Sequence, residues 1–329
     1  METKAYACIN TDNLVRLNSS SGGIYPLLAL KYIEHGGIVF AAVYDDEFNV
    51  VHRMINNPEG ISLSQGSKYV ASVLGDSFKS ILQLLSTGKK VLFVGTPCQC
   101  AGLNSFLEQN HIDRDCIILI DFVCHGIPSR MVWNEYKKSL RRRNKSFIAV
   151  NMRDKTSGWS KGNYSWKFSL ENGGSSVVPR RDVSFMKGML TNLYLRPSCY
   201  DCHFKGIGRC TDLTLGDYWG VWNHMPEMDD DKGTSLVLIH SERGLRLFDE
   251  IRNNTIYQAA NLIEAIKANS CIVVSAKCNP SREEFFRRIG SGEDFSTIVQ
   301  ELTSLKIKKK IINRVKAIIT HTSQPKNCI

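Results

Sequence analysis

Five cysteines in two groups are the side chains best suited to chemistry in this sequence. Cys98 and Cys124 each follow an apolar run, whereas Cys199 and Cys202 form a C-x-x-C pair that Cys210 follows. A C-x-x-C loop presents two sulfurs to a metal ion or an iron–sulfur cluster, or works as a dithiol redox pair. With Cys98 and Cys124 as further ligands, we favour a 4Fe-4S cluster, with structural zinc as the alternative and Cys210 as a reserve ligand.

Two short strands are expected to position the first two of these cysteines. Residues 91–94 and 117–123 are continuous apolar runs, which are typical of central strands that are covered on both faces. If the two strands are parallel neighbours, Cys98 and Cys124 meet at the carboxyl edge of the sheet, where open α/β folds bind ligands. This edge is therefore the predicted functional site.

The residues around Cys98 predict the start of a helix. Thr96 has the side chain of a helix N-cap, and Pro97 suits the first helical position. Cys98 would then lie in the first turn, where the helix dipole stabilises a thiolate. After Cys124, residues 125–129 lead into a second predicted helix.

The pattern of the whole chain indicates an α/β fold. Residues 24–35 predict a helix and residues 38–44 a strand, and residues 163–178 predict an inserted antiparallel hairpin. From residue 241 onward the pattern is helical. We therefore expect a mixed sheet with flanking helices, the hairpin region and a helical C-terminal extension.

Length, charge and cysteine usage narrow the class of protein. The chain has 329 residues, a net charge of +10 and eleven cysteines. It has no apolar run long enough to span a membrane, and its start does not resemble a signal peptide, so a cytoplasmic location and reduced thiols are expected. The charge suits anionic partners. A zinc-stabilised, non-catalytic binding protein is one alternative, although the basic residues form no nucleic-acid motif that we recognise.

A serine- and glycine-rich segment offers a place for a second cofactor. Ser20, Ser21, Gly22 and Gly23 precede the helix predicted for residues 24–35, and small residues with free amides at a helix start suit a pyrophosphate. An ordinary cap and turn is the alternative. Later in the chain, Lys68 offers a cation for a phosphate and Tyr69 offers an aromatic ring for a flat ring system. A plain surface turn is the alternative for these two residues.

Acid–base candidates are few. His125 follows Cys124 directly, and Lys155 belongs to an Arg153-Asp154-Lys155 run shortly before Trp159. A cation beside an indole suits an anionic cofactor or substrate. The alternative for His125 is a capping or core-packing role. The alternative for residues 153–155 is a solvated hairpin end.

Six motifs follow one another along the chain. They are Ser20-Ser21-Gly22-Gly23, Gly66-Ser67-Lys68-Tyr69, Gly95-Thr96-Pro97-Cys98-Gln99, Cys124-His125-Gly126-x-Pro128-Ser129, the Cys199/Cys202 pair and residues 212–220. In this order they resemble the coenzyme F420 hydrogenase/dehydrogenase beta-subunit family, over residues 18 to 251. The resemblance implies an iron–sulfur flavoprotein oxidoreductase that binds FAD and one 4Fe-4S cluster in an α/β scaffold, and that passes electrons between the cluster and a two-electron acceptor at the flavin.

The resemblance also implies roles for particular residues. The expected cluster ligands are Cys98, Cys124, Cys199 and Cys202, with Cys210 in reserve. The residues expected near the flavin are Ser20, Ser21, Gly22, Gly23, Lys68, Tyr69, Thr96 and Gln99. The implied regions are an N-terminal flavin-binding region at 1–90, a C-terminal family region with the cluster ligands at 91–250, and a helical extension with a basic tail at 251–329.

The donor and the acceptor follow from the resemblance only in outline. Archaeal relatives use coenzyme F420, and in bacteria a polysaccharide-biosynthesis intermediate is a plausible acceptor. Many bacterial relatives carry a ferredoxin-like segment with two C-x-x-C-x-x-C runs before the flavin region, whereas here only Cys8 precedes it. The electrons are therefore expected from a separate ferredoxin or ferredoxin-like partner. An electron-relay subunit of a larger complex is another alternative. The tail, residues 302–320, is basic and amphipathic, which suits contact with an anionic membrane surface or docking on the protein's own core.

Overall fold

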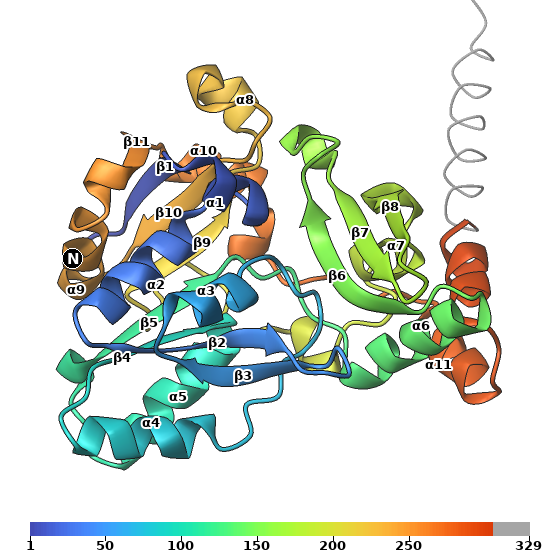
Figure 1. The fold of residues 1–329 in the computed structure, drawn as a ribbon, viewed down its shortest axis with the longest axis horizontal. Coiled ribbons are helices and arrows are strands. Elements are labelled where there is room, and N and C mark those ends of the chain that lie inside the picture. The colour runs from blue at the N-terminus through green and yellow to red at the C-terminus, as the bar shows by residue number, and fades with distance from the viewer. Residues whose placement is uncertain (305–329) are drawn as a thin grey trace, which may run out of the picture.

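An eight-stranded mixed sheet forms the centre of the molecule (Figure 1). The structure is a computed structural model, and it describes residues 1–304. The strands of the sheet are β1 (Lys4–Asn10), β2 (Ile38–Tyr44), β3 (Val50–Ile55), β4 (Val91–Gly95), β5 (Ile117–Phe122), β9 (Leu213–Asp217), β10 (Ser235–Ile239) and β11 (Thr255–Ala259). Their order across the sheet is β11-β1-β10-β9-β5-β4-β2-β3.

The middle of this sheet is parallel and its two sides are antiparallel. β2, β4, β5 and β9 run in the same direction, and β4 and β5 are hydrogen-bonded neighbours. β3 is antiparallel to β2, and β10 is antiparallel to both β9 and β1. The strands that precede Cys98 and Cys124 are therefore parallel neighbours, which is the condition under which the two cysteines meet at one edge of the sheet.

Helices cover both faces of the sheet. They are α1 (Asn13–Asn18), α2 (Ile24–Glu34), α3 (Pro58–Ser64), α4 (Ser77–Ser86), α5 (Pro97–Gln109), α8 (Val221–His224), α9 (Glu242–Asp249) and α10 (Leu262–Ala268). Leu28 of α2 shares one apolar cluster with Leu92 of β4, whereas Leu103 of α5 shares another with Phe93 of β4. Successive residues of β4 thus meet apolar partners on opposite faces, which explains why its sequence is a continuous apolar run.

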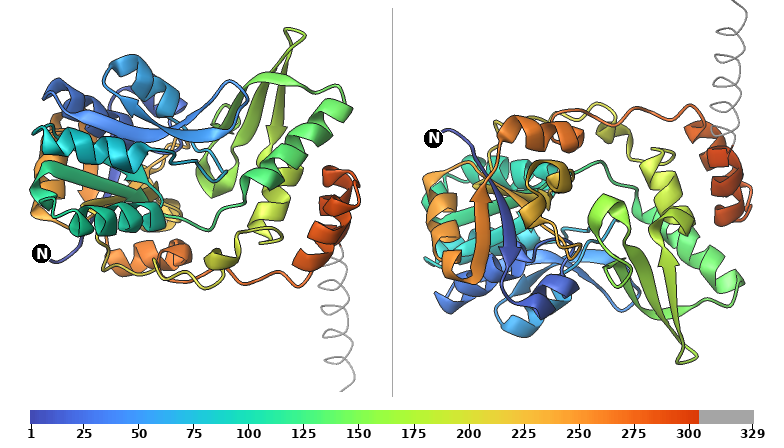
Figure 2. Two further views of the ribbon diagram at one scale, coloured as in Figure 1. Left: turned by 90° about the horizontal axis from the view of Figure 1, so that it is seen from below. Right: turned by 90° about the horizontal axis from the view of Figure 1, so that it is seen from above.

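A second, three-stranded antiparallel sheet stands beside the first (Figures 1 and 2). It consists of β6 (Phe147–Asp154), β7 (Ser165–Leu170) and β8 (Ser175–Pro179). The helices α6 (Arg130–Arg142), α7 (Ser184–Leu190) and α11 (Arg282–Gly290) lie around it, together with the helical residues 295–304. Trp133, Trp166, Phe185 and Phe295 bring these elements into one aromatic cluster. Aromatic burial of this extent gives the second sheet a core of its own.

The expected α/β class, with its mixed sheet, hairpin region and C-terminal helices, is confirmed. The predicted hairpin is β7 and β8, and the structure adds β6 as a third strand. The prediction of helices from residue 241 onward missed β11, a five-residue strand that pairs with β1 at the edge of the large sheet. Such a short, mostly exposed strand has no apolar pattern of its own, because its pairing depends on a strand from the other end of the chain.

Residues 305–329 lie outside the described part of the chain, and most of the predicted amphipathic tail falls among them. Within residues 1–304, none of the helices is both long and apolar enough to cross a lipid bilayer.

Two histidines, the buried His52 and the half-buried His240, predict a loss of stability in acid. Burial lowers the pKa of His52 and that of His240 to about 4. His52 Nε2 lies 2.9 Å from the carbonyl oxygen of Val94, and its other ring nitrogen is buried without a partner among the described residues. The unfolded chain binds these protons near pH 6.5, so stability is retained above that pH and falls between pH 6.5 and pH 4.

At about 1.4 kcal/mol per pKa unit, each histidine is expected to lower the free energy of unfolding by about 3 kcal/mol at pH 4. Urea unfolding at several pH values measures this loss. His52→Gln should remove about half of it, and an unchanged pH dependence in that variant would contradict the assignment to His52.

Candidate functional site

Four cysteines from distant parts of the chain line one pocket. They are Cys98, Cys124, Cys199 and Cys202, the four that the sequence selects. Cys98 follows β4 and Cys124 follows β5, so both lie at the carboxyl edge of the parallel strands. The structure therefore brings the C-x-x-C pair to the edge where the other two thiols lie.

Cys98 lies in the first turn of α5, as the sequence predicts. The Thr96 hydroxyl accepts a hydrogen bond from the Gln99 backbone N–H, and the Gln99 side chain accepts one from the Thr96 backbone N–H. This reciprocal capping box, with Pro97 at the start of the helix, sets where α5 begins. The Thr96 hydroxyl also lies 3.1 Å from Cys98 Sγ, so the cap helps to orient the thiol.

Gly126 allows the loop after Cys124 to approach the C-x-x-C pair. Its φ is +141°, and a Cβ at this position would lie 3.2 Å from Cys199 Cβ and 2.8 Å from Leu195 Cδ1. A side chain here would push the two loops apart. The Arg196 backbone N–H donates to the Ile127 carbonyl at 3.0 Å and holds the loops together.

Three of the pocket cysteines, Cys124, Cys199 and Cys202, are half-buried, whereas Cys98 is exposed, and a lysine lines the same pocket. Burial raises the pKa of Cys124 to about 12, and the positive charge of Lys205 opposes this rise. Burial also raises the pKa of Cys199. Lys205 lines the pocket, but the sequence did not single it out, because a lysine in a loop has no distinguishing pattern.

The reserve cysteine lies elsewhere. Cys210 is exposed and is not among the residues that line the four-cysteine pocket, and its carbonyl accepts a hydrogen bond from Arg114 at 3.2 Å. Among residues 1–304, no three or more His, Cys, Asp or Glu side chains are arranged as ligands of a single metal ion.

His125 and Lys155, the acid–base candidates, have different surroundings. His125 lines the cysteine pocket, its Nε2 lies 2.7 Å from Asn192 Oδ1, and burial lowers its pKa. The Lys155 ammonium donates to the carbonyls of Arg16, Ser21 and Lys232 at 2.6 to 2.8 Å. These three bonds use all the donors of an ammonium, which suits a role in holding backbone segments together.

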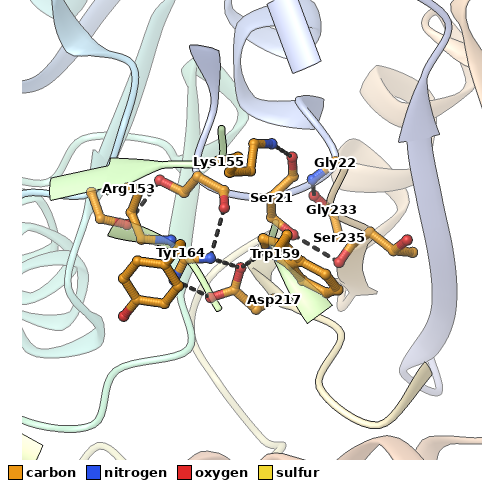
Figure 3. Close-up of polar contacts among 12 residues, drawn as sticks. Ser21, Gly22, Arg153, Lys155, Trp159, Tyr164, Asp217, Gly233 and Ser235 are labelled. Atoms are coloured by element: carbon orange, nitrogen blue, oxygen red, sulfur yellow. Dashed lines mark hydrogen bonds and ion pairs between the residues drawn. The ribbon is translucent and has the colours of Figure 1, made fainter. Parts of the chain in front are cut away.

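A buried network joins the second sheet to the serine- and glycine-rich segment (Figure 3). Arg153, 2% exposed, forms a two-pronged ion pair with Asp217 at 2.7 and 3.0 Å, and it donates to the Ser20 carbonyl at 2.7 Å and to the Tyr69 hydroxyl at 3.1 Å. Trp159 Nε1 also donates to Asp217 at 3.1 Å. The sequence pointed to Arg153 and Trp159 but not to Asp217 as their partner, since the two segments lie far apart in the chain.

Ser20 and Tyr69 are the only residues expected near the flavin that Arg153 contacts among the described residues, and further hydrogen bonds connect the loops that carry the others. The Ser67 hydroxyl donates to the Ser20 hydroxyl at 2.8 Å, which links the first two predicted motifs. The Lys68 ammonium instead donates to three carbonyls of its own loop, and burial lowers its pKa to about 7. Gln99 reaches the Ser72 hydroxyl at 2.9 Å. Loops from three motifs therefore lie side by side at the sheet edge.

Close packing leaves no room for a side chain at Gly22. A Cβ there would overlap the Cys8 carbonyl oxygen and would lie 2.7 Å from the Ser235 nitrogen. The Gly22 N–H donates to the Ser235 hydroxyl at 2.9 Å, and Ser21 donates to the Thr234 carbonyl at 2.7 Å. The segment before α2 is thus held against the start of β10 (Figure 3).

Comparisons with known proteins identify a matching family and a similar fold. A protein family described as the C terminus of the coenzyme F420 hydrogenase/dehydrogenase beta subunit matches residues 88–265. A chain of the F420-reducing NiFe hydrogenase complex from Methanosarcina barkeri, in a xenon derivative, is similar in fold with a TM-score of 0.54. The two chains are 18% identical, over 81% of this chain and 89% of that chain. No curated protein matches the sequence.

Proposed function

The chain belongs to the coenzyme F420 hydrogenase/dehydrogenase beta-subunit family, and on this premise we propose that it is an iron–sulfur flavoprotein oxidoreductase. One observation carries the proposal: Cys98, Cys124, Cys199 and Cys202 line a single pocket at the carboxyl edge of the parallel strands. Four thiols around one space are the usual donor set of a 4Fe-4S cluster. The residues present therefore fit the group that the family implies.

The flavin is proposed to lie beside the loops that precede α2 and follow α3. Residues 20–23 precede α2, an eleven-residue helix without a side-chain cap, so the backbone N–H groups of Ile24 and Tyr25 suit a pyrophosphate. Arg153 and Lys155 hold the carbonyls of Ser20 and Ser21, which fixes the path of this segment. The set of residues proposed to lie near the flavin is completed by Lys68, Tyr69, Thr96 and Gln99.

When bound, the cluster and FAD would supply the exchange between one-electron and two-electron transfer. The contribution of the chain is to place the two sites on neighbouring loops of one sheet edge. Thr96 supports this arrangement, because it caps α5, contacts Cys98 and belongs to the motif that the family resemblance places near the flavin.

A ferredoxin or ferredoxin-like protein is the proposed donor, and the proposed acceptor takes two electrons. Coenzyme F420 and a polysaccharide-biosynthesis intermediate are the two acceptors to test first. Activity that appears only after a partner subunit is added would instead indicate a relay subunit.

An anaerobic visible spectrum of the reconstituted protein, with iron, sulfide, zinc and flavin measured on the same sample, tests the proposal. We expect thiolate-to-iron absorption, about four irons and about one flavin per chain. A colourless protein that contains zinc and neither iron nor flavin would contradict it and would support the zinc-stabilised binding protein. Failure of the loaded protein to reduce any two-electron acceptor would contradict the oxidoreductase function alone.

A further inference from the structure

Lys205 joins three loops at the four-cysteine pocket. It follows the C-x-x-C pair and lines the pocket itself. Its ammonium donates to the carbonyl oxygen of Cys124 at 2.5 Å and to that of Cys271 at 2.6 Å. The side chain thus links its own loop to the loop after β5 and to the segment that precedes Val273.

The Lys205 ammonium can donate one further hydrogen bond. An ammonium carries three N–H donors, and two of them are accounted for by the carbonyls of Cys124 and Cys271. Within residues 1–304, the third has no hydrogen-bond acceptor. Because Lys205 lines the pocket, a group bound there is a suitable acceptor.

The charge of Lys205 also lacks a carboxylate partner among the described residues. The other cation that lines the pocket, Arg209, is neutralised by a buried ion pair with Asp121 at 2.9 Å. Lys205 bonds only to uncharged carbonyl groups, so its positive charge remains available to the pocket. A half-buried charge acts strongly on its neighbours, because little water screens it.

The geometry points to Lys205 as a positioning residue that holds the Cys124 loop against the C-x-x-C loop and supplies a fixed positive charge that favours the reduced state of the bound cluster. This inference rests on the proposed function. One-electron reduction by the ferredoxin-like donor adds one negative charge and forms or breaks no bond to the protein. A nearby cation stabilises the more negative state, which raises the reduction potential.

The test compares Lys205→Gln with Lys205→Arg, and uses Lys89→Gln as a matched control. Lys89 is exposed, and its only hydrogen bond among the described residues is a backbone bond to Leu84, so its replacement removes the same net charge from the protein without touching the pocket. The midpoint potential of each reconstituted protein is measured by a dithionite titration followed by electron paramagnetic resonance, and iron is quantified on the same samples.

We expect Lys205→Gln to shift the one-electron equilibrium about tenfold towards the oxidised cluster, which corresponds to a potential about 59 mV lower. Lys205→Arg and Lys89→Gln should stay close to the wild-type potential. An unchanged potential in Lys205→Gln overturns the inference. A wild-type protein that binds no iron would overturn the proposed function instead.

Loss of iron from Lys205→Gln is also informative. If Lys205→Arg then keeps both its iron and the wild-type potential, the charge at this position is needed and the inference is supported. If Lys205→Arg loses its iron as well, while circular dichroism shows both variants folded, the fixed charge is not what the pocket requires and the inference is overturned.

Discussion

Cys124→Ser is expected to reduce the iron bound per chain from about four to less than one. Cys124 lies at the end of the central parallel strands, and its thiol faces the pocket that three other cysteines share. A serine hydroxyl is a harder and shorter donor than a thiolate, and the surroundings that raise the pKa of the thiol would disfavour an alkoxide even more. Iron and sulfide analysis with the visible spectrum measures the loss.

Two other cysteines provide controls of the same chemistry. Cys278 and Cys210 are exposed and do not line the pocket, so serine at either position should leave the iron content unchanged. Full retention of iron by Cys124→Ser would contradict its role as a ligand. Loss of iron from Cys210→Ser would make Cys210 a ligand and would mean that one of the other four is not.

Arg153→Met is expected to lower the free energy of unfolding by about 3–5 kcal/mol, because it removes one partner of a buried ion pair. Arg153 is 2% exposed, and its loss leaves the Asp217 carboxylate without its ion-pair partner. The Ser20 carbonyl and the Tyr69 hydroxyl also lose the hydrogen bonds that Arg153 donates to them. Urea unfolding of the apoprotein measures this cost. If the flavin lies where we propose, the same variant should also bind less FAD.

An exposed arginine gives the matched comparison. Arg181, 85% exposed, contacts Asp182 across 3.7 Å, so Arg181→Met should change stability by less than about 1 kcal/mol. The double variant of Arg153→Met with Asp217→Asn should recover part of the loss, since no carboxylate is then left unpaired. Equal effects of the two arginine replacements would show that the buried pair contributes nothing.

Much of the local structure can be read from the sequence. Residues 38–44 form β2 as predicted, and Thr96 with Pro97 sets the start of α5. These signals are local, because an apolar run, a helix cap and a turn each depend on a few adjacent residues. The five candidate cysteines could be selected for the same reason, since ligand spacing and strand ends are visible in the chain itself.

The sequence by itself determined which residue types are available and which short elements carry them. Only the tertiary structure decided that β4 and β5 are neighbours, that Asp217 meets Arg153, and that Lys205 reaches the Cys124 carbonyl. Contacts of this kind join segments tens of residues apart. They depend on which strands pair and on which faces are buried together, and no periodicity within either segment records that choice.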